Sequence, residues 1–277
     1  MQNQFRPVGF NILPPVVKNL LIINGLMFLI NVVMEDRFGI SLNSKLGLFY
    51  PESTYFKPYQ IFTHIFMHGS FMHLFFNMFS LWMFGSVLEN YWGPKRFFIY
   101  YFVTGFGAAA IHLGFNAFEV IQLKQQIQTY LSQPGYDAFY ALQQIDTRLL
   151  DSEELQRFMQ SWSMQKDNPQ YLAYSKEIAE AVLQSKINIP TVGASGAVYG
   201  LLLAFGMLFP NTLLFMLFIP IPIKAKYFVI IYGVLELYQG FVNNPGDNVA
   251  HFAHLGGMLF GFFLIKFWNK TRRNTFY

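Results

Sequence analysis

The chain has 277 residues, of which 53% are hydrophobic, 19% aromatic and only 12% charged, and its mean hydropathy is positive. A soluble globular domain carries about twice that share of charged residues, so the composition excludes that class and predicts a protein that crosses a membrane several times. The net charge of +4 does not indicate nucleic-acid binding, because the basic residues flank apolar runs, and the lack of cysteine excludes disulfides and thiolate sites.

Apolar runs divide the chain into predicted membrane spans, and we expect a single all-α polytopic membrane domain over residues 1–277. The six predicted spans are 15–34, 71–90, 97–116, 192–210, 227–242 and 251–268. The first run lacks a small-residue cleavage site, so we interpret it as a retained span. Residues 35–70 predict a compact, partly embedded loop. Residues 211–225 are broken by Pro220 and Pro222 and predict an interfacial connection.

Residues 117–190 differ from the spans around them, because they contain nine acidic and six basic residues and show amphipathic periodicity. We interpret them as a water-facing helical insertion between spans three and four. Basic residues fall on one side of a six-span arrangement, which places both termini in the cytoplasm and the insertion outside. The compact six-span arrangement favours a location in the bacterial plasma membrane, where the lipid bilayer is a partner of the protein.

Polar residues interrupt three of these apolar runs near one end. Measured from the inner interface at 1.5 Å per residue, Ser195 and His254 both lie about 22 Å up, His73 about 25 Å and Asn77 about 20 Å. The hydrocarbon core is about 30 Å thick, so all four lie at one level below the outer surface. Polar groups at that depth are costly unless they share a wet cavity. We therefore expect a common site that opens outward.

Glycines predict how closely two of these spans approach. Gly196 and Gly200 are four apart on span four, and Gly257 and Gly261 are four apart on span six. Small residues at this spacing let helix backbones pack closely, which would bring Ser195 to His254. The alternative for the glycines alone is ordinary helix packing without chemistry.

The residue types at this level suit nucleophilic catalysis. His254 is the candidate base for the Ser195 hydroxyl, and Tyr199, one turn below Ser195, is placed to stack on the His254 ring. The Ser195 amide opens a helix, and His73 and Asn77 share one helix face, so these three groups are the candidate oxyanion donors. We expect a dyad without an acid and leave Glu236, within span five, without a role.

Three other histidines have less specific interpretations. His64, His68 and His73 lack the His-Glu-x-x-His helix pair of zinc enzymes, so we expect no metal site and no cofactor. We expect His68 to hold the outer loop by hydrogen bonds to backbone, and His64 and His251 to be structural or interfacial.

Together these motifs resemble the rhomboid intramembrane serine proteases. The resemblance rests on Gly193-Ala194-Ser195-Gly196 with Tyr199, on Ala253-His254 with Gly257 and Gly261, and on His68, His73 and Asn77. It implies Ser195 as nucleophile, His254 as general base, and His73, Asn77 and the Ser195 N–H as the oxyanion hole. It also implies transmembrane proteins as substrates, cleaved near the outer face, and neither metal nor nucleotide.

Two features depart from the family pattern. Tyr59-Gln60 stands where the family often has Trp-Arg in the first outer loop, and the insertion lies beyond the minimal six-span core. The insertion is either a determinant of substrate choice or gating, or a tolerated surface excursion. The alternative functions are a catalytically silent rhomboid-like module that binds membrane proteins and a transporter, although no inverted repeat supports the latter.

Overall fold

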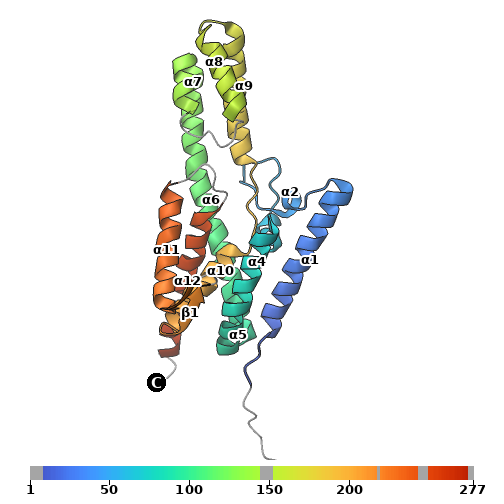
Figure 1. The fold of residues 1–277 in the computed structure, drawn as a ribbon, viewed down its shortest axis with the longest axis vertical. Coiled ribbons are helices and arrows are strands. Elements are labelled where there is room, and N and C mark those ends of the chain that lie inside the picture. Colours follow the sequence, from blue (N-terminus) through green and yellow to red (C-terminus); the bar gives the residue numbers. More distant parts are fainter. Residues whose placement is uncertain (1–8, 144–151, 217–218, 243–248, 274–277) are drawn as a thin grey trace, which may run out of the picture.

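A computed structural model describes residues 9–143, 152–216, 219–242 and 249–273, which form a helical bundle with a helical extension at one end (Figure 1). The elements in chain order are α1 (Pro15–Phe38), α2 (Asn43–Leu46), α3 (Gln60–Thr63), η1 (His64–Phe66), α4 (Phe71–Ser80), η2 (Leu81–Gly85), α5 (Ser86–Trp92), α6 (Pro94–Ser132), α7 (Tyr136–Gln143), α8 (Ser152–Ser163), α9 (Pro169–Ile187), α10 (Ser195–Leu208), β1 (Leu213–Met216), β2 (Ile219–Lys224), α11 (Ala225–Val242) and α12 (His251–Arg273).

In the part of the chain that the structure describes, three helical segments are long and apolar enough to cross a membrane: Pro15–Phe38, Phe71–Trp92 and Pro94–Ser132. The second consists of α4, the π-helical turn η2 and α5. α10 is apolar but shorter, and α11 and α12 lie beside each other and against α10. The chain is therefore an integral membrane protein, while six spans and their orientation stay a prediction. The start of α1 and the end of α12 lie at the same end of the bundle (Figure 1).

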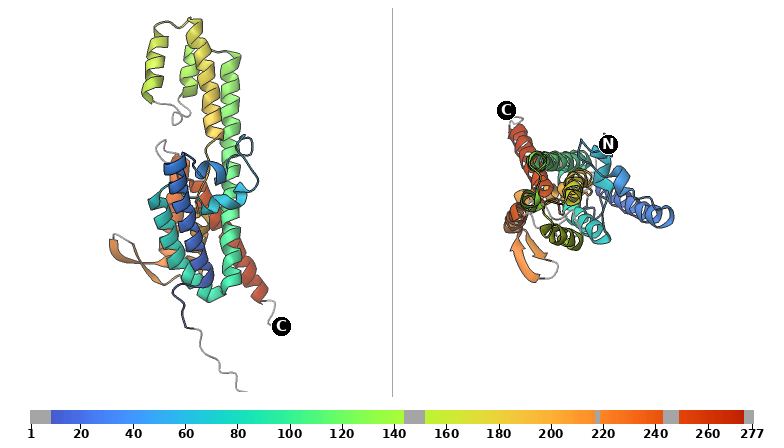
Figure 2. Two further views of the ribbon diagram at one scale, coloured as in Figure 1. Left: turned by 90° about the vertical axis from the view of Figure 1, so that its right-hand side faces the viewer. Right: turned by 90° about the horizontal axis from the view of Figure 1, so that it is seen from above.

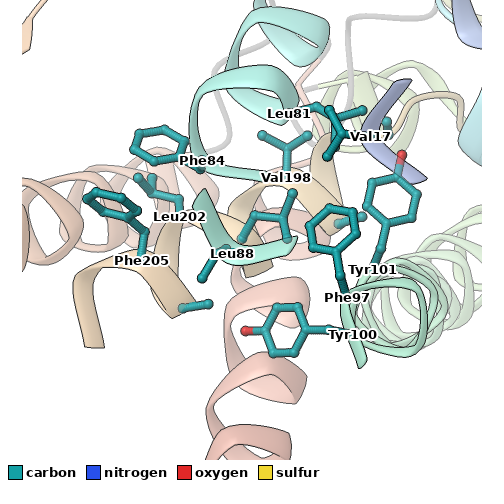
Figure 3. Packing of buried hydrophobic residues seen from close by; sticks show 14 of the residues in the cluster. Val17, Leu81, Phe84, Leu88, Phe97, Tyr100, Tyr101, Val198, Leu202 and Phe205 are labelled. Atoms are coloured by element: carbon teal, nitrogen blue, oxygen red, sulfur yellow. The ribbon is translucent and has the colours of Figure 1, made fainter. Parts of the chain in front are cut away.

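Helix α10 is the centre of the bundle. Small and apolar residues occur around its whole circumference, which is the pattern of a helix buried on all sides. Val198, Leu202 and Phe205 of α10 pack among Phe84 and Leu88 of the second segment (Figure 3). This core fixes the first turn of α10, where Ser195 lies.

The start of α1 is attached to this core by a buried carboxylate. Glu89 is 2% exposed, and its two oxygens accept hydrogen bonds from Val16 N (3.0 Å) and Val17 N (2.8 Å). An acidic group at a helix N-terminus satisfies N–H groups that have no partner within the helix. Glu89, which lies on α5, therefore caps the start of α1.

The insertion is a continuation of the third span. The helix expected to end near residue 116 runs without interruption through α6 to Ser132, 39 residues and about 58 Å in all. Because the hydrocarbon core is about 30 Å thick, nearly half of α6 extends beyond it. α7, α8 and α9 pack with the upper part of α6 around a separate core that includes Trp162, Phe139 and Tyr130 (Figures 1 and 2).

The connection between α10 and α11 differs from the all-α expectation. It forms an antiparallel hairpin, in which Leu213 pairs with Lys224 and Leu214 with Ile223, with a register irregularity after Phe215. The hairpin projects sideways from the bundle (Figure 2). Pro220 and Pro222, interpreted as helix breakers, both lie in β2.

The loop between α1 and α4 is held by Gln60, which stands where the family often has arginine. Gln60 is 1% exposed; its Nε2 donates to the carbonyls of Lys45 (3.2 Å) and Tyr55 (2.9 Å), and its Oε1 accepts from Phe49 N (3.4 Å) and Lys57 N (3.0 Å). One amide thus binds four backbone groups of the loop. Gln60 anchors the loop without an arginine.

Candidate active site

Ser195 and His254 meet where α10 and α12 cross. Ser195 Oγ lies 2.9 Å from His254 Nε2, Ser195 is half-buried and His254 is 7% exposed. Ser195 is the first residue of α10, so the N–H groups of its first turn have no carbonyl within their own helix to bond. The Ser195 hydroxyl and the backbone N–H donors of the first turn of α10 therefore lie close together.

The turn before α10 is shaped by Gly193. Its φ of 126° is a conformation that residues with a side chain rarely adopt, and its N–H donates to the carbonyl of His64 at 2.9 Å. A Cβ at Gly193 would lie 2.8 Å from both Cε1 and Nε2 of His73. The bare backbone of Gly193 lets the His73 ring lie against the turn that presents Ser195.

Asn77 and His68 have other partners than expected. Asn77 Nδ2 donates to the carbonyl of His73 at 2.9 Å within α4. The ring nitrogens of His68 form no close, well-aligned hydrogen bond with a described residue, although the Phe66 backbone lies near the ring, so attachment of the loop by this ring stays a prediction. The loop is bound to the His68 backbone, because the His68 carbonyl accepts from Asn43 Nδ2 at 3.2 Å. The His68 ring itself packs against His73, with centroids 5.1 Å apart.

The glycines act at a junction of three helices, α6, α10 and α12. A Cβ on Gly257 would come within 1.9 Å of the Gly196 carbonyl oxygen, so Gly257 lets α12 approach α10, whereas a Cβ on Gly196 would first meet Ala108 of α6, at 2.3 Å. Gly200 faces Thr104 of α6, and Gly261 faces the hydroxyl of Tyr100, also of α6. The expectation that both glycine pairs face each other is therefore wrong for Gly200 and Gly261, which make room for α6.

Tyr199 and His254 are stacked, with ring centroids 4.1 Å apart and planes inclined by 8°. The Tyr199 hydroxyl donates to Glu236 Oε1. Glu236 Oε2 lies 2.9 Å from His254 Nδ1 and 2.7 Å from His251 Nδ1. The expectation that no acid accompanies the serine and histidine is wrong, because a buried carboxylate contacts the imidazole on the side away from Ser195.

The sequence contains one signal that would have pointed to Glu236. At 1.5 Å per residue, Glu236 lies about 17 Å along α11 from Ala225, the first residue of that helix. Ser195 lies about 20 Å from Leu208, the end of α10 on the same side of the bundle. The same estimate of depth therefore places Glu236 close to the level of Ser195 and His254.

The carboxylate cluster also has the composition of a metal site. One ligand atom from each of Glu236, His251 and His254 lies within 4.8 Å of the others. Both Nδ1 atoms lie at hydrogen-bond distance from the same oxygen, Oε2, which accounts for the arrangement without a cation. The expectation that the chain holds no metal stays a prediction.

The residues preceding Ser195 join the site to the extension. Thr191 forms a bridge with Leu48 of the loop between α1 and α4, and its Oγ1 lies 2.9 Å from His112 Nε2 on α6. Ser53 Oγ donates to Asn188 Oδ1 at 2.6 Å. Sequence reasoning gave no role to His112 or Thr191, which hold the approach to Ser195.

Comparison with protein families gives one match. The family model described as Rhomboid domain matches residues 55–142 and 169–269. The matched ranges include Ser195, His254, Glu236 and His73, and they leave out 143–168, in which α8 lies. No curated protein matches the chain. Since the matched ranges cover more than half of the 277 residues, the chain belongs to the rhomboid family.

Proposed function

We propose that this protein is an intramembrane serine endopeptidase that hydrolyses peptide bonds in or near transmembrane segments of other membrane proteins. The observation that carries the proposal is the 2.9 Å contact between Ser195 Oγ and His254 Nε2 in a buried helix junction. A serine hydroxyl is a weak nucleophile until an adjacent base accepts its proton, and this contact supplies the base.

The reaction proceeds in two halves. His254 Nε2 accepts the hydroxyl proton while Ser195 Oγ attacks the substrate carbonyl carbon, and the tetrahedral intermediate then expels the amine, which takes the proton from His254. This leaves an acyl ester on Ser195. A water molecule, deprotonated by the same imidazole, attacks the ester and releases the new carboxyl end, and Ser195 regains its proton.

The carbonyl oxygen becomes negatively charged in each half. The Ser195 N–H at the start of α10 and the ring of His73, which lies against Gly193, are the nearest candidate donors. Asn77 supports them from one turn further along α4, because its amide nitrogen carries a second hydrogen besides the one donated to the His73 carbonyl. Stacking on Tyr199 limits rotation of the His254 ring, which keeps Nε2 directed at Ser195.

The substrate class follows from the location of the site. A peptide bond in a membrane helix is protected by its own hydrogen bonds, so a substrate segment must unwind locally and enter a hydrated cavity on the extracytoplasmic side. Small or helix-weakening residues near the cut lower that cost. The α7–α9 extension is placed to influence which segments reach the site.

The test is cleavage of a single-span reporter protein by the purified full chain in detergent and in liposomes. We compare wild type, Ser195→Ala and His254→Ala, with Ser161→Ala, an exposed serine of α8, as the control. Wild type and the control should cleave the reporter and react with a fluorophosphonate probe, whereas the two site variants should not. Equal cleavage by all four proteins, or capture of the reporter by wild type without cleavage, would refute the proposal.

A further inference from the structure

We infer that Glu236 is a positioning residue that completes a Ser195–His254–Glu236 triad. The inference rests on the proposed protease function and adds to it an acid on a third helix, α11. Glu236 is 6% exposed, and its carboxylate is within hydrogen-bond distance of His254 Nδ1 at 2.9 Å, while the opposite nitrogen of that ring contacts Ser195. The Glu236 carboxylate, the His254 imidazole and the Ser195 hydroxyl are therefore connected by two successive hydrogen-bond contacts.

The first consequence concerns the tautomer of His254. An ionised carboxylate only accepts hydrogen bonds, so the contact with Glu236 places the ring proton on Nδ1. A neutral imidazole carries a single N–H, so Nε2 keeps a lone pair directed at the Ser195 hydroxyl. Glu236 therefore selects the form of His254 that is able to accept the serine proton.

The second consequence concerns charge. When His254 takes the serine proton it becomes an imidazolium in a site that is largely shielded from water, and Glu236 places a negative charge against it. The carboxylate thus stabilises the imidazolium form of His254, which arises during the reaction, more than the neutral form of the resting enzyme. An interaction raises the rate only if it is stronger in the transition state than in the resting state.

The carboxylate is itself held in place from two helices. Tyr199 of α10 donates to Oε1, and His251 of α12 lies 2.7 Å from Oε2 through its Nδ1. Tyr199 also stacks on His254, so one side chain orients both members of the acid–base pair. A carboxylate fixed in this way does not rotate away from the imidazole, as a purely surface acid would.

A structural role is the main alternative, because any buried carboxylate needs donors. Glu89 provides the comparison: it is also buried, and it accepts two hydrogen bonds from the backbone of α1. Loss of its charge should weaken the fold without changing the chemistry of folded molecules. A metal role is a second alternative, but two ligand atoms about 2.0–2.1 Å from one tetrahedral zinc ion lie about 3.3 Å apart. The Nδ1–Oε2 contacts of 2.7 and 2.9 Å are shorter and have hydrogen-bond lengths.

The experiment compares Glu236→Gln, Glu236→Asp and the matched control Glu89→Gln in the full chain, with kcat and KM measured on the single-span reporter. In Glu236→Gln the side-chain amide can donate to Nδ1 and favour the wrong tautomer. We expect kcat to fall on the order of 100-fold or more with KM within about threefold of wild type. Fluorophosphonate labelling of Ser195 should slow in parallel.

Recovery by a conservative change separates positioning from structure. Glu236→Asp keeps the charge and should recover part of the kcat that Glu236→Gln loses, with KM close to that of wild type. Glu89→Gln should lower the melting temperature and leave kcat per folded molecule unchanged.

Wild-type kcat in Glu236→Gln would overturn the triad while leaving the proposed protease function intact. If Glu236→Gln does not accumulate, Glu236→Ala decides, because wild-type kcat per folded molecule without the carboxylate would equally overturn it. Failure of the protease proposal gives a different result, namely a wild-type protein that does not cleave the reporter. Loss of wild-type activity on chelation, restored by zinc, would also count against the triad.

Discussion

The carbonyl oxygen of Gly196 occupies the space that a side chain on Gly257 would need, since a Cβ there would come within 1.9 Å of it. This contact joins the helix that carries Ser195 to the helix that carries His254. The Oγ–Nε2 distance of 2.9 Å depends on it, because neither helix can move away without separating the two side chains.

Gly257→Ala should therefore abolish cleavage and lower stability, because the obstruction is backbone and cannot rotate away. Overpacking of this kind costs about 1–3 kcal/mol or more in unfolding free energy. Gly114→Ala on α6, where a Cβ would meet nothing within 4 Å, is the control and should be neutral or slightly stabilising. Thermal unfolding and reporter cleavage measure both effects. An active Gly257→Ala protein of unchanged stability would contradict the helix contact.

His73→Ala tests the proposed oxyanion donor. Loss of one such donor typically lowers kcat by about 10²–10³-fold. KM should change little, since the donor acts on charge that develops during the reaction. The control is Phe71→Ala, on the same helix and 63% exposed, which should retain wild-type kcat. A kcat in His73→Ala within twofold of wild type would remove His73 from the oxyanion hole.

His68 should make the fold sensitive to acid. Burial, with a contribution from His73, lowers the pKa of His68 to about 3 in the folded protein. The unfolded chain has the ordinary pKa of 6.5, so below that value it binds a proton that the folded protein does not. Stability is complete above pH 6.5 and falls as the pH drops toward 3, by about 2 kcal/mol at pH 5.

The measurement is the melting temperature as a function of pH for wild type and His68→Gln, which has no ring to protonate. The slope between pH 6.5 and pH 5 should be smaller in His68→Gln. Identical slopes would show that His68 does not retain its neutral form in the fold.

Trp162→Ala tests whether the extension folds around its own core. Trp162 is 0% exposed and packs with Tyr136, Phe139 and Phe158, apart from the core around α10. The cavity should cost about 3–5 kcal/mol locally and make α7–α9 sensitive to protease. Labelling of Ser195 by the fluorophosphonate should be unchanged. Met164→Ala, at an exposed position, is the control for proteolysis. Loss of labelling in Trp162→Ala would show that the extension supports the site.

Local signals in the sequence predicted much of this arrangement. The apolar runs predicted α1, the second segment and the start of α6, and the Gly-Ala-Ser-Gly stretch predicted the start of α10 at Ser195. The end of α6 was missed because the change from apolar to amphipathic composition near residue 117 does not require a helix to stop. The first strong breakers after that point are Pro134 and Gly135, directly beyond Ser132.

Contacts between helices were the part that the sequence did not reveal. Glu236 is 18 residues from His254, and their meeting depends on how α11 packs against α12, which no local pattern specifies. Gln60 is similar: an amide that binds four backbone groups of one loop is recognisable only once the loop is folded. The identity of a residue suggested its chemistry, whereas its partners came from packing.

The β1–β2 ribbon has a consequence for where the lipid ends. Among the described residues its two outer strand margins have no neighbouring strand, and acyl chains offer their amide and carbonyl groups nothing to bond. We therefore expect the ribbon to reach the headgroup layer, with the exposed side chains of Leu213, Phe215 and Ile221 toward the lipid. On this expectation the headgroup layer lies at the lower end of α10, and Ser195 lies about 20 Å above it.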